Sequence, residues 1–323
     1  IGSPLALWVE NRDWTSWQKV LDPVAVDPQK AELRRIRSPR PGHADLTGAQ
    51  KYLRRDPRDV LERASARETT GRVAAGAFAK MVLAEVGVEI QSGVRSLGPI
   101  GADRPVPGWD EVAAVDDASP LRAIHRDLED EMVALVDRAK EEGETLGGAV
   151  TVVARGVPPG LGSHIAWDAK LDGRLAQALM SVPAVKAVEI GAAVDAAGGF
   201  GSAAHDAIRH EAGRFRRDSN RAGGLEGGIT NGEDVVVTAY KKPIATLRRG
   251  LPSVDLDTLE PHTSQYERSD VTALPAAGVI AEAMVALLLA DALLEKLGGD
   301  SMTELLAHWR STRELTAAWP ASP

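Results

Sequence analysis

A long helix rich in alanine and glycine is the feature that most constrains how this chain can fold. Ser65 and Glu68 have the spacing of a capping box, in which the serine begins the helix and the glutamate stands three residues later. Small and apolar residues continue to Val86, and Gly87 is a suitable stop. Because five of the six residues from 74 to 79 are alanine or glycine, we expect this helix to pack close to its neighbours.

The other elements favour an α+β fold. Strands are predicted at residues 4–10, 88–97, 150–154 and 235–240, a further core segment at 184–190, and helices at 120–142, 168–181 and 277–296. The elements do not alternate in strict βαβ order and no Gly-x-Gly-x-x-Gly loop follows a strand, so a Rossmann fold is not expected. We predict one domain over residues 1–316, followed by a loose tail at 317–323.

Composition excludes several kinds of chemistry. The 323 residues include no cysteine, which excludes disulfides, thiolate metal sites and cysteine nucleophiles and favours a cytoplasmic location. The longest apolar stretch, residues 279–294, contains Glu282 and Asp291 and is short for a membrane span. His205 and His210 fit no common zinc spacing, so no metal site is predicted.

Positive charge is concentrated in one stretch of an acidic protein. The whole chain has a net charge of −8, whereas residues 30–72 contain twelve Lys or Arg and six Asp or Glu, a local net charge of +6. A basic region of this kind favours a small polyanion as ligand over nucleic acid.

The helix start at Ser65 is one candidate binding segment for such an anion. A helix N-terminus offers free N–H groups, and Arg63 and Arg67 flank this one with guanidinium groups that can grip phosphate or carboxylate. An ordinary capped surface helix would show the same pattern.

His43 is the candidate general acid or base. It lies in a Pro-Gly loop between Arg40 and Asp45, and an imidazole can give or accept a proton near neutral pH. The alternative is a loop histidine that is simply hydrogen-bonded to Asp45.

Three later segments add polar or glycine-rich positions. They are the glycine-rich run at 220–228, where a flat ligand could approach the backbone, residues 242–246, where a lysine and a threonine could hold a phosphate, and Arg268 with Asp270 before a helix. A flexible loop, a strand end and an exposed ion pair are the respective alternatives.

Together these strings resemble the chorismate synthase family over residues 1–299. The similarity is carried by Arg-Pro-Gly-His-Ala-Asp at 40–45, Arg-Ala-Ser-Ala-Arg-Glu-Thr at 63–69, Glu-Thr-Leu-Gly-Gly at 144–148, Val-Glu-Ile-Gly at 188–191, Ser-Asn-Arg-Ala-Gly-Gly-Leu-Glu-Gly-Gly-Ile-Thr-Asn-Gly at 219–232, Lys-Pro at 242–243 and Arg-Ser-Asp at 268–270.

The resemblance implies a phospho-lyase that uses reduced FMN, with NADPH as a candidate reductant. The implied reaction is the 1,4-anti elimination of phosphate from 5-enolpyruvylshikimate 3-phosphate, which gives chorismate. The implied fold is a β-α-β sandwich with helices packed between antiparallel sheets, and the implied assembly is a cytoplasmic homotetramer that binds neither nucleic acid nor membrane.

The family's functional positions carry over residue by residue. His43 and Asp270 match catalytic positions. Substrate-binding positions match Arg40, Ser65, Ala66, Arg67 and Arg268. Flavin-binding positions match Arg63, Ala64, Ser65, Pro183, Ala184, Asn220, Gly228, Lys242, Pro243, Ile244, Ala245, Thr246 and Arg268.

Three departures accompany the match. A Gln-Ala pair expected at a flavin position is Pro183-Ala184 here, and Ala245 replaces a serine, which would remove a hydrogen bond worth about 1 kcal/mol. A Gly-x-Ser-His-Gly segment, whose histidine is thought to protonate the leaving phosphate, would lie upstream of Ile1. We therefore expect the sequence to be incomplete at its N-terminus, and a non-catalytic relative that binds FMN or phosphate, or acts as a partner subunit, is the alternative.

Overall fold

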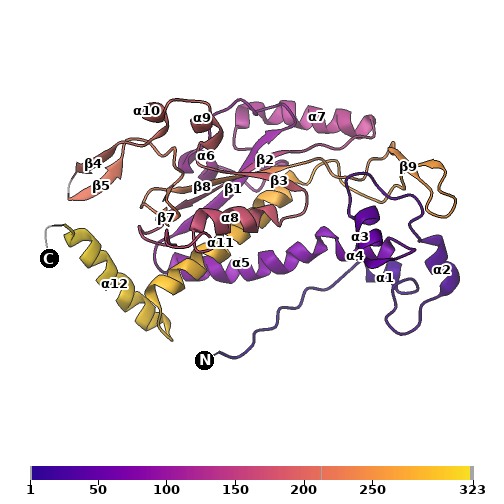
Figure 1. The fold of residues 1–323 in the computed structure, drawn as a ribbon, viewed down its shortest axis with the longest axis horizontal. Helices are drawn as coiled ribbons and strands as arrows, with labels where there is room; N and C mark the ends of the chain where they lie inside the picture. The colour runs from indigo at the N-terminus through magenta and orange to yellow at the C-terminus, as the bar shows by residue number, and fades with distance from the viewer. Residues whose placement is uncertain (1, 212, 321–323) are drawn as a thin grey trace.

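The centre of the fold is a four-stranded antiparallel sheet with strand order β1-β2-β8-β3 (Figure 1). The computed structural model describes residues 2–211 and 213–320. The strands span, in sheet order, Glu89–Leu97, Gly148–Arg155, Val235–Lys241 and Val185–Ile190. The two central strands are rich in valine and are buried on both faces along most of their length, as expected for strands inside a sheet.

Three helices cover one face of this sheet (Figure 1). They are α5 (Thr69–Ala84), α8 (Leu171–Met180) and α11 (Leu274–Leu297). Helix α11 lies against β1 and β2 and between the other two helices. It is long and apolar enough for a membrane span, but thirteen of its residues are buried within the protein, so its role as the core helix accounts for that composition.

The opposite face of the sheet is apolar at one end only. Helix α6 (Trp109–Ala113) packs Trp109 and Val112 onto Val153 and Val236 there. At the other end of the same face the sheet carries buried polar groups, among them Arg95 and Glu189. This face of the sheet is therefore apolar at one end and carries a network of buried polar groups at the other.

The remaining elements lie around this core. They are α1 (Trp14–Trp17), α2 (Pro28–Leu33), α3 (Asp45–Tyr52), α4 (Arg58–Arg63), α7 (Glu129–Glu141), α9 (Ala193–Ala197), α10 (Gly201–Ala204) and α12 (Met302–Ala318), the 3-10 turns Ala66–Glu68 and Arg126–Leu128, and the ribbons β4 (Ile208–Glu211) with β5 (Arg214–Arg217), β6 (Leu225–Glu226) with β7 (Ile229–Thr230), and β9 (Pro252–Val254) with β10 (Pro261–Thr263). The first four helices gather beyond one end of the sheet (Figure 1).

The α+β class and the antiparallel pairing are confirmed. In the described residues the helical layer has one four-stranded sheet, and the other strands form only two-stranded ribbons, so the second sheet of the expected sandwich does not appear there. The ribbon strands are two to four residues long and cannot cover a helix the length of α5.

Two local predictions were wrong, and one helix was missed. Residues 4–10 form no strand, and Trp8 is exposed because no strand pairs with this segment. The helix predicted from residue 120 begins only at Glu129, because Ile124 instead donates its N–H to the carbonyl of Val94 beside β1. Helix α12 was not predicted, and it extends to Ala318, inside the predicted tail.

The helix start at Ser65 is only partly as predicted. The Ser65 hydroxyl accepts a hydrogen bond from the N–H of Arg67 (3.3 Å), which caps a 3-10 turn that leads into α5. Glu68 does not complete the capping box, because its carboxylate binds Arg72 one turn later. The expected close helix packing is confirmed: a Cβ added to Gly76 would lie 2.4 Å from the Cβ of Ala283 on α11.

Replacing Gly76 with valine should therefore destabilise the protein by about 1–3 kcal/mol, because the added methyl groups would force α5 away from α11. Urea denaturation followed by circular dichroism measures the change. Gly71→Ala on the same helix is the matched control, since a Cβ there meets nothing within 4 Å and alanine favours helix by about 0.5–1 kcal/mol. Equal destabilisation by both substitutions would contradict the close contact.

Candidate functional site

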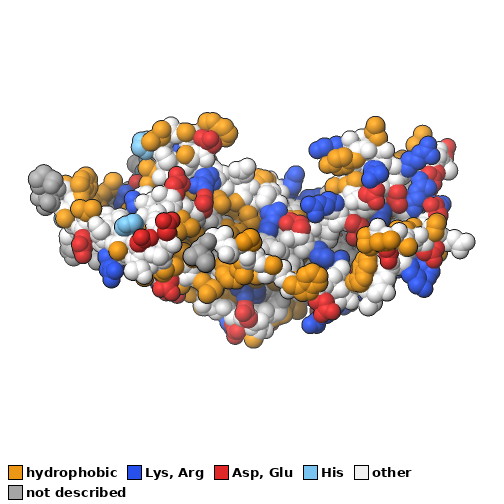
Figure 2. Space-filling view, turned by 90° about the horizontal axis from the view of Figure 1, so that it is seen from below, with side chains coloured by type: hydrophobic (Ala, Val, Ile, Leu, Met, Phe, Trp, Pro, Cys, Tyr) orange, Lys and Arg blue, Asp and Glu red, His pale blue; other side chains and the backbone are white. Residues whose placement is uncertain are grey.

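The candidate site lies at the end of the sheet where β8 ends. There Lys241 pairs with Gly148 at the start of β2 and with Val185 at the start of β3. The loops that leave these strands meet the N-terminal helices at this end. Many of the Lys and Arg side chains seen in Figure 2 lie over the part of the molecule that carries these helices. Cationic groups from distant parts of the chain are therefore brought to one edge.

A buried ion pair organises the loop at residues 40–45. The Arg40 guanidinium is 7% exposed and Asp45 is fully buried, and Arg40 Nε lies 2.8 Å from Asp45 Oδ2. Asp45 also accepts the backbone N–H of Arg40 (3.1 Å). The other two guanidinium nitrogens donate to Thr246 Oγ1 (2.6 Å) and to Asp45 Oδ1 (3.0 Å). Arg40 thus joins two segments that are 206 residues apart, and each of its three guanidinium nitrogens is hydrogen-bonded within the protein.

Asp45 fixes the orientation of His43. His43 Nδ1 lies 2.6 Å from Asp45 Oδ1, and an ionised carboxylate only accepts hydrogen bonds, so Nδ1 carries the proton that is donated to it. The other ring nitrogen, Nε2, is then the atom that can exchange a proton with a ligand. The side chain of His43 is partly exposed, with 24% of its surface accessible.

The pKa of Asp45 is lowered well below its ordinary value. Burial alone would raise it, but the hydrogen bonds and charges of His43 and Arg40 outweigh the burial. Asp45 is therefore ionised wherever the protein is folded under ordinary conditions, which keeps the Arg40 charge compensated in its buried place.

Lys242 joins the loop of His43 to β8 and β3. Its ammonium group donates to the carbonyl of Gly42, and its backbone N–H donates to the carbonyl of Ala184 (2.9 Å). Ala184 has a left-handed backbone (φ 69°), a conformation that costs a non-glycine residue energy and is concentrated at functional sites. The residues that match flavin positions at 183–184 and 242–246 are therefore adjacent in space.

The segment from Arg63 to Arg67 reaches the same end of the sheet through Arg72. Arg72 donates to the Ser181 hydroxyl (2.7 Å), two residues before Pro183. Arg63 is exposed and forms no ion pair among the described residues, whereas Arg67 contacts Asp13 at 3.4 Å with both side chains half exposed. An exposed pair of this kind is weak, so Arg67 is free to bind an anion.

The segment with Arg268 and Asp270 is held at both ends. Before it, Glu267 pairs with the buried Arg58 of α4 at 2.7 Å. After it, the carbonyl of Val271 accepts the N–H of Leu146 (2.8 Å), which leads into β2. Arg268 and Asp270 themselves are exposed, so both side chains remain available at this edge.

Asn220 and Gly228 are not brought to this edge. The Asn220 side chain donates to the carbonyl of Asp234 (2.7 Å), and the carbonyl of Gly228 accepts the N–H of Leu171 (3.0 Å). Both contacts lie beyond the start of β8, whereas Lys242 follows its end, and the strand separates them. Within one chain these two residues do not join His43.

Arg58, Arg72 and Glu267 were missed as organisers of this region. Each acts through a contact with a residue more than one hundred positions away, and the sequence carries no local signal for such contacts. The contact between His43 and Asp45, given above as the alternative to a catalytic histidine, is present and orients the ring.

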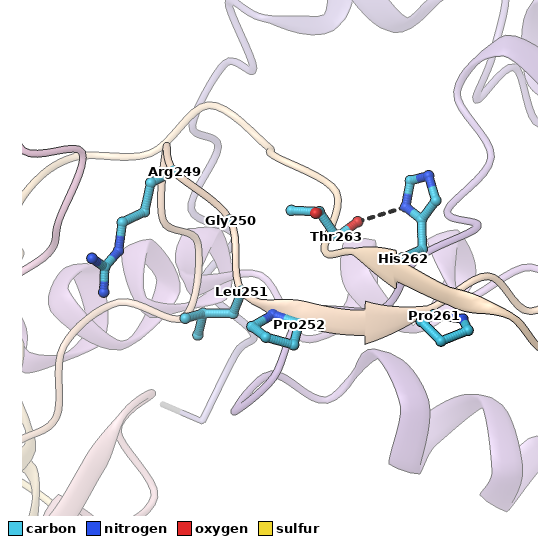
Figure 3. A pocket seen from close by; sticks show the side chains of 7 residues that line it. All are labelled: Arg249, Gly250, Leu251, Pro252, Pro261, His262 and Thr263. Carbon is cyan, nitrogen blue, oxygen red and sulfur yellow. Dashed lines mark hydrogen bonds between the residues drawn. The ribbon is translucent and has the colours of Figure 1, made fainter.

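A separate, shallow depression lies beside β9 and β10 (Figure 3). Its volume is about 510 Å³, and Arg249, Pro252, His262 and Thr263 are among its lining residues. His262 Nδ1 contacts the carbonyl of Thr263 (2.8 Å) and the hydroxyl of Ser38 (2.9 Å). None of the predicted site residues lines it.

Replacing Asp45 with asparagine should lower the free energy of unfolding at pH 7 by about 3–5 kcal/mol, because Arg40 would keep a buried charge without its counter-ion. The folded-state pKa lies below the ordinary 3.8, so the stabilisation by Asp45 is complete above about pH 4 and is lost as the pH falls further. Guanidinium denaturation at pH 7 and pH 3 measures both effects, and the difference between the two proteins should shrink at pH 3.

Asp59→Asn is the matched control. Asp59 pairs with Arg54 at 3.3 Å and both side chains are more than half exposed, so its loss should cost about 0–1 kcal/mol. If the two variants were destabilised equally, the ion pair of Arg40 and Asp45 would not have the organising role given to it here.

Comparisons with known proteins agree on one family. The family model described as "Chorismate synthase" matches residues 1–294. The chorismate synthase of Solibacter usitatus is 52% identical over 318 residues, which are 97% of this chain and 81% of that protein, and that of Brevibacillus brevis is 50% identical over 98% of this chain and 82% of its own. A solved structure titled "Crystal Structure of Chorismate Synthase" superposes with a TM-score of 0.73 at 42% identity, covering 85% of this chain and 77% of that one.

Proposed function

Because the chain belongs to the chorismate synthase family, we propose that it converts 5-enolpyruvylshikimate 3-phosphate to chorismate and phosphate at the edge of the sheet around His43. The observation that carries this proposal is the network of Arg40, His43, Asp45 and Thr246, which fixes one imidazole beside several cationic groups.

The residues at this edge fit reduced FMN as cofactor. Gly42 lies against Lys242, with a position for a Cβ only 3.2 Å from the Lys242 ammonium, so a side chain there would crowd the lysine that could hold a phosphate. Arg63 and Arg268 are exposed at the same edge without carboxylate partners among the described residues. When bound, reduced FMN would supply electron density to the departing phosphate and a proton acceptor at its N5 atom.

The chain's own residues would bind, orient and move protons. Lys242 would hold the flavin phosphate, and residues 63–65 and 183–184 would line the cofactor. Arg67 and Arg268 would grip the substrate's carboxylates and phosphate, because a guanidinium binds oxyanions through two hydrogen bonds. His43 would exchange a proton through Nε2: the neutral ring, with its proton on Nδ1, would accept one there, and the imidazolium so formed would donate it. Asp270 would assist proton transfer near the flavin. Arg40 would act as a positioning residue, since it is buried and each of its three guanidinium nitrogens is already hydrogen-bonded within the protein.

His43→Ala should lower kcat by about 10²–10⁴ while substrate binding is retained, the usual scale for a lost proton-transfer group. Anaerobic turnover of 5-enolpyruvylshikimate 3-phosphate with photoreduced FMN, followed by chorismate absorbance, measures kcat. His308→Ala, which alters an exposed histidine of α12 that contacts only the carbonyl of Leu297 among the described residues, is the control and should be unaffected. A wild-type rate in His43→Ala would remove His43 from the reaction.

We also propose a cytoplasmic homotetramer in which a second copy completes the flavin site. Asn220 and Gly228 match flavin positions but lie at the far end of β8 from His43, so they could reach that flavin only from another subunit. NADPH is the proposed reductant. Closed symmetric assemblies readily place two different surface segments of one chain beside each other.

Co-expression of two inactive variants tests this shared site. If His43→Ala and Asn220→Ala each abolish activity, mixed oligomers should recover it at about a quarter of their sites, where both wild-type residues meet. Purified mixtures assayed as above measure the recovery. If sedimentation shows that mixed tetramers have formed and they still recover no activity, each subunit forms its site alone.

A further inference from the structure

The segment Glu-Thr-Leu-Gly-Gly at residues 144–148 connects α7 to β2, and none of the roles proposed above falls on it. Its threonine, Thr145, is only 9% exposed although it lies in a connection between two elements. Buried hydroxyl groups in proteins are nearly always hydrogen-bonded. The partner of Thr145 therefore indicates what this segment does.

Thr145 holds the loop that follows β8. Its hydroxyl donates a hydrogen bond to the carbonyl of Ile244 (2.7 Å), which lies 99 residues further along the chain. Two residues later, Thr246 Oγ1 accepts the hydrogen bond from Arg40 (2.6 Å). The loop at 242–246 is thus held at two points by two separate segments of the chain.

Gly147 brings the backbone of the same loop directly against this segment. A Cβ added to Gly147 would lie 2.4 Å from the carbonyl oxygen of Lys241 and 2.8 Å from the nitrogen of Pro243. Both distances are far shorter than a van der Waals contact, so a side chain at position 147 would displace the loop. Residues 144–148 therefore form the surface on which the loop rests.

The hydrogen bond of Thr145 also orients the next peptide unit. In a planar trans peptide the carbonyl and the N–H point in opposite directions. Because the carbonyl of Ile244 points to Thr145, the N–H of Ala245 points away from Thr145. The N–H groups of Ile244, Ala245 and Thr246 donate no hydrogen bond to any residue that the structure describes. Successive free N–H groups of this kind can bind an anion.

We propose that Thr145 is a positioning residue of the cofactor site. Its hydroxyl fixes the peptide unit between Ile244 and Ala245, so that the loop presents the Ala245 N–H, beside the Lys242 ammonium, to the phosphate of the flavin. Ala245 has no hydroxyl, so the backbone N–H is the donor that this position offers. The inference rests on the function proposed above, because it takes FMN as the ligand of this loop.

Thr145→Val tests this role, because valine keeps the shape of the side chain and removes the hydroxyl. The affinity for photoreduced FMN should fall about three- to tenfold, the scale of one lost hydrogen bond. Anaerobic equilibrium dialysis, with the flavin quantified by absorbance after reoxidation, measures the affinity. Thr145→Ser retains the hydroxyl and should restore most of the binding.

Thr151→Val is the matched control. Thr151 is fully buried further along β2, and its hydroxyl is hydrogen-bonded to the hydroxyl of Thr238 (2.9 Å). The substitution removes a buried threonine hydroxyl from the same strand region but leaves the loop at 242–246 untouched. This variant should bind FMN as the wild type does.

Amide hydrogen exchange of the flavin-free protein tests the anchoring without any cofactor. The N–H groups of Lys242 and Arg249 are hydrogen-bonded within the protein and report on the two ends of the loop. Thr145→Val should speed exchange at both, whereas Thr151→Val should leave it unchanged.

Three results would overturn the proposal. Unchanged exchange in Thr145→Val would show that the hydroxyl does not hold the loop. Faster exchange with wild-type FMN affinity would show that the loop is held for a reason other than the cofactor. Equal loss of binding in Thr145→Val and Thr145→Ser would show that the hydroxyl is not the group that matters. If the wild-type protein bound no FMN, the function proposed above would fail together with the cofactor role, and the exchange data would still decide whether Thr145 anchors the loop.

Discussion

The buried pair of Arg40 and Asp45 is the contact on which the candidate site depends. It is placed in a loop before α3, yet through Thr246 it reaches a segment that follows β8. A buried charge is stable only with its counter-ion and its hydrogen bonds, so the two loops hold each other in place. The same carboxylate orients His43. The same ion pair therefore stabilises this edge of the fold and orients the imidazole of His43.

The core was largely predictable because its signals are local. Helices α5 and α11 and strands β1, β2 and β8 follow from residue size and periodicity, and these need only neighbouring residues. The segment after residue 119 was predicted as helix and instead pairs beside Val94, because a contact with β1 outweighed its local preference. The strand predicted around Trp8 is absent for the opposite reason: no other strand lies beside this segment to pair with it.

The candidate site was predictable only in part. The resemblance to a family assigned several distant segments to one site. In the structure these segments lie at one edge of the sheet: residues 40–45, 63–69, 183–184, 242–246 and 268–270. Arg58 and Arg72 could not be recognised, because their partners are set by tertiary packing.

The attachment of the N-terminal helices has a consequence for the local stability of this part of the molecule. Residues 35–58 are joined to residues 255–267 by hydrogen bonds and ion pairs, such as Arg35 with Asp257, Ser38 with His262 and Arg58 with Glu267. Helices α5 and α11, by contrast, pack so closely at Gly76 that one added methyl group would clash with Ala283. Polar attachments can separate at a smaller cost in free energy than a packed apolar core. The N-terminal helices are therefore attached to the rest of the protein mainly by polar contacts, whereas the sheet and its central helices are held together by apolar packing.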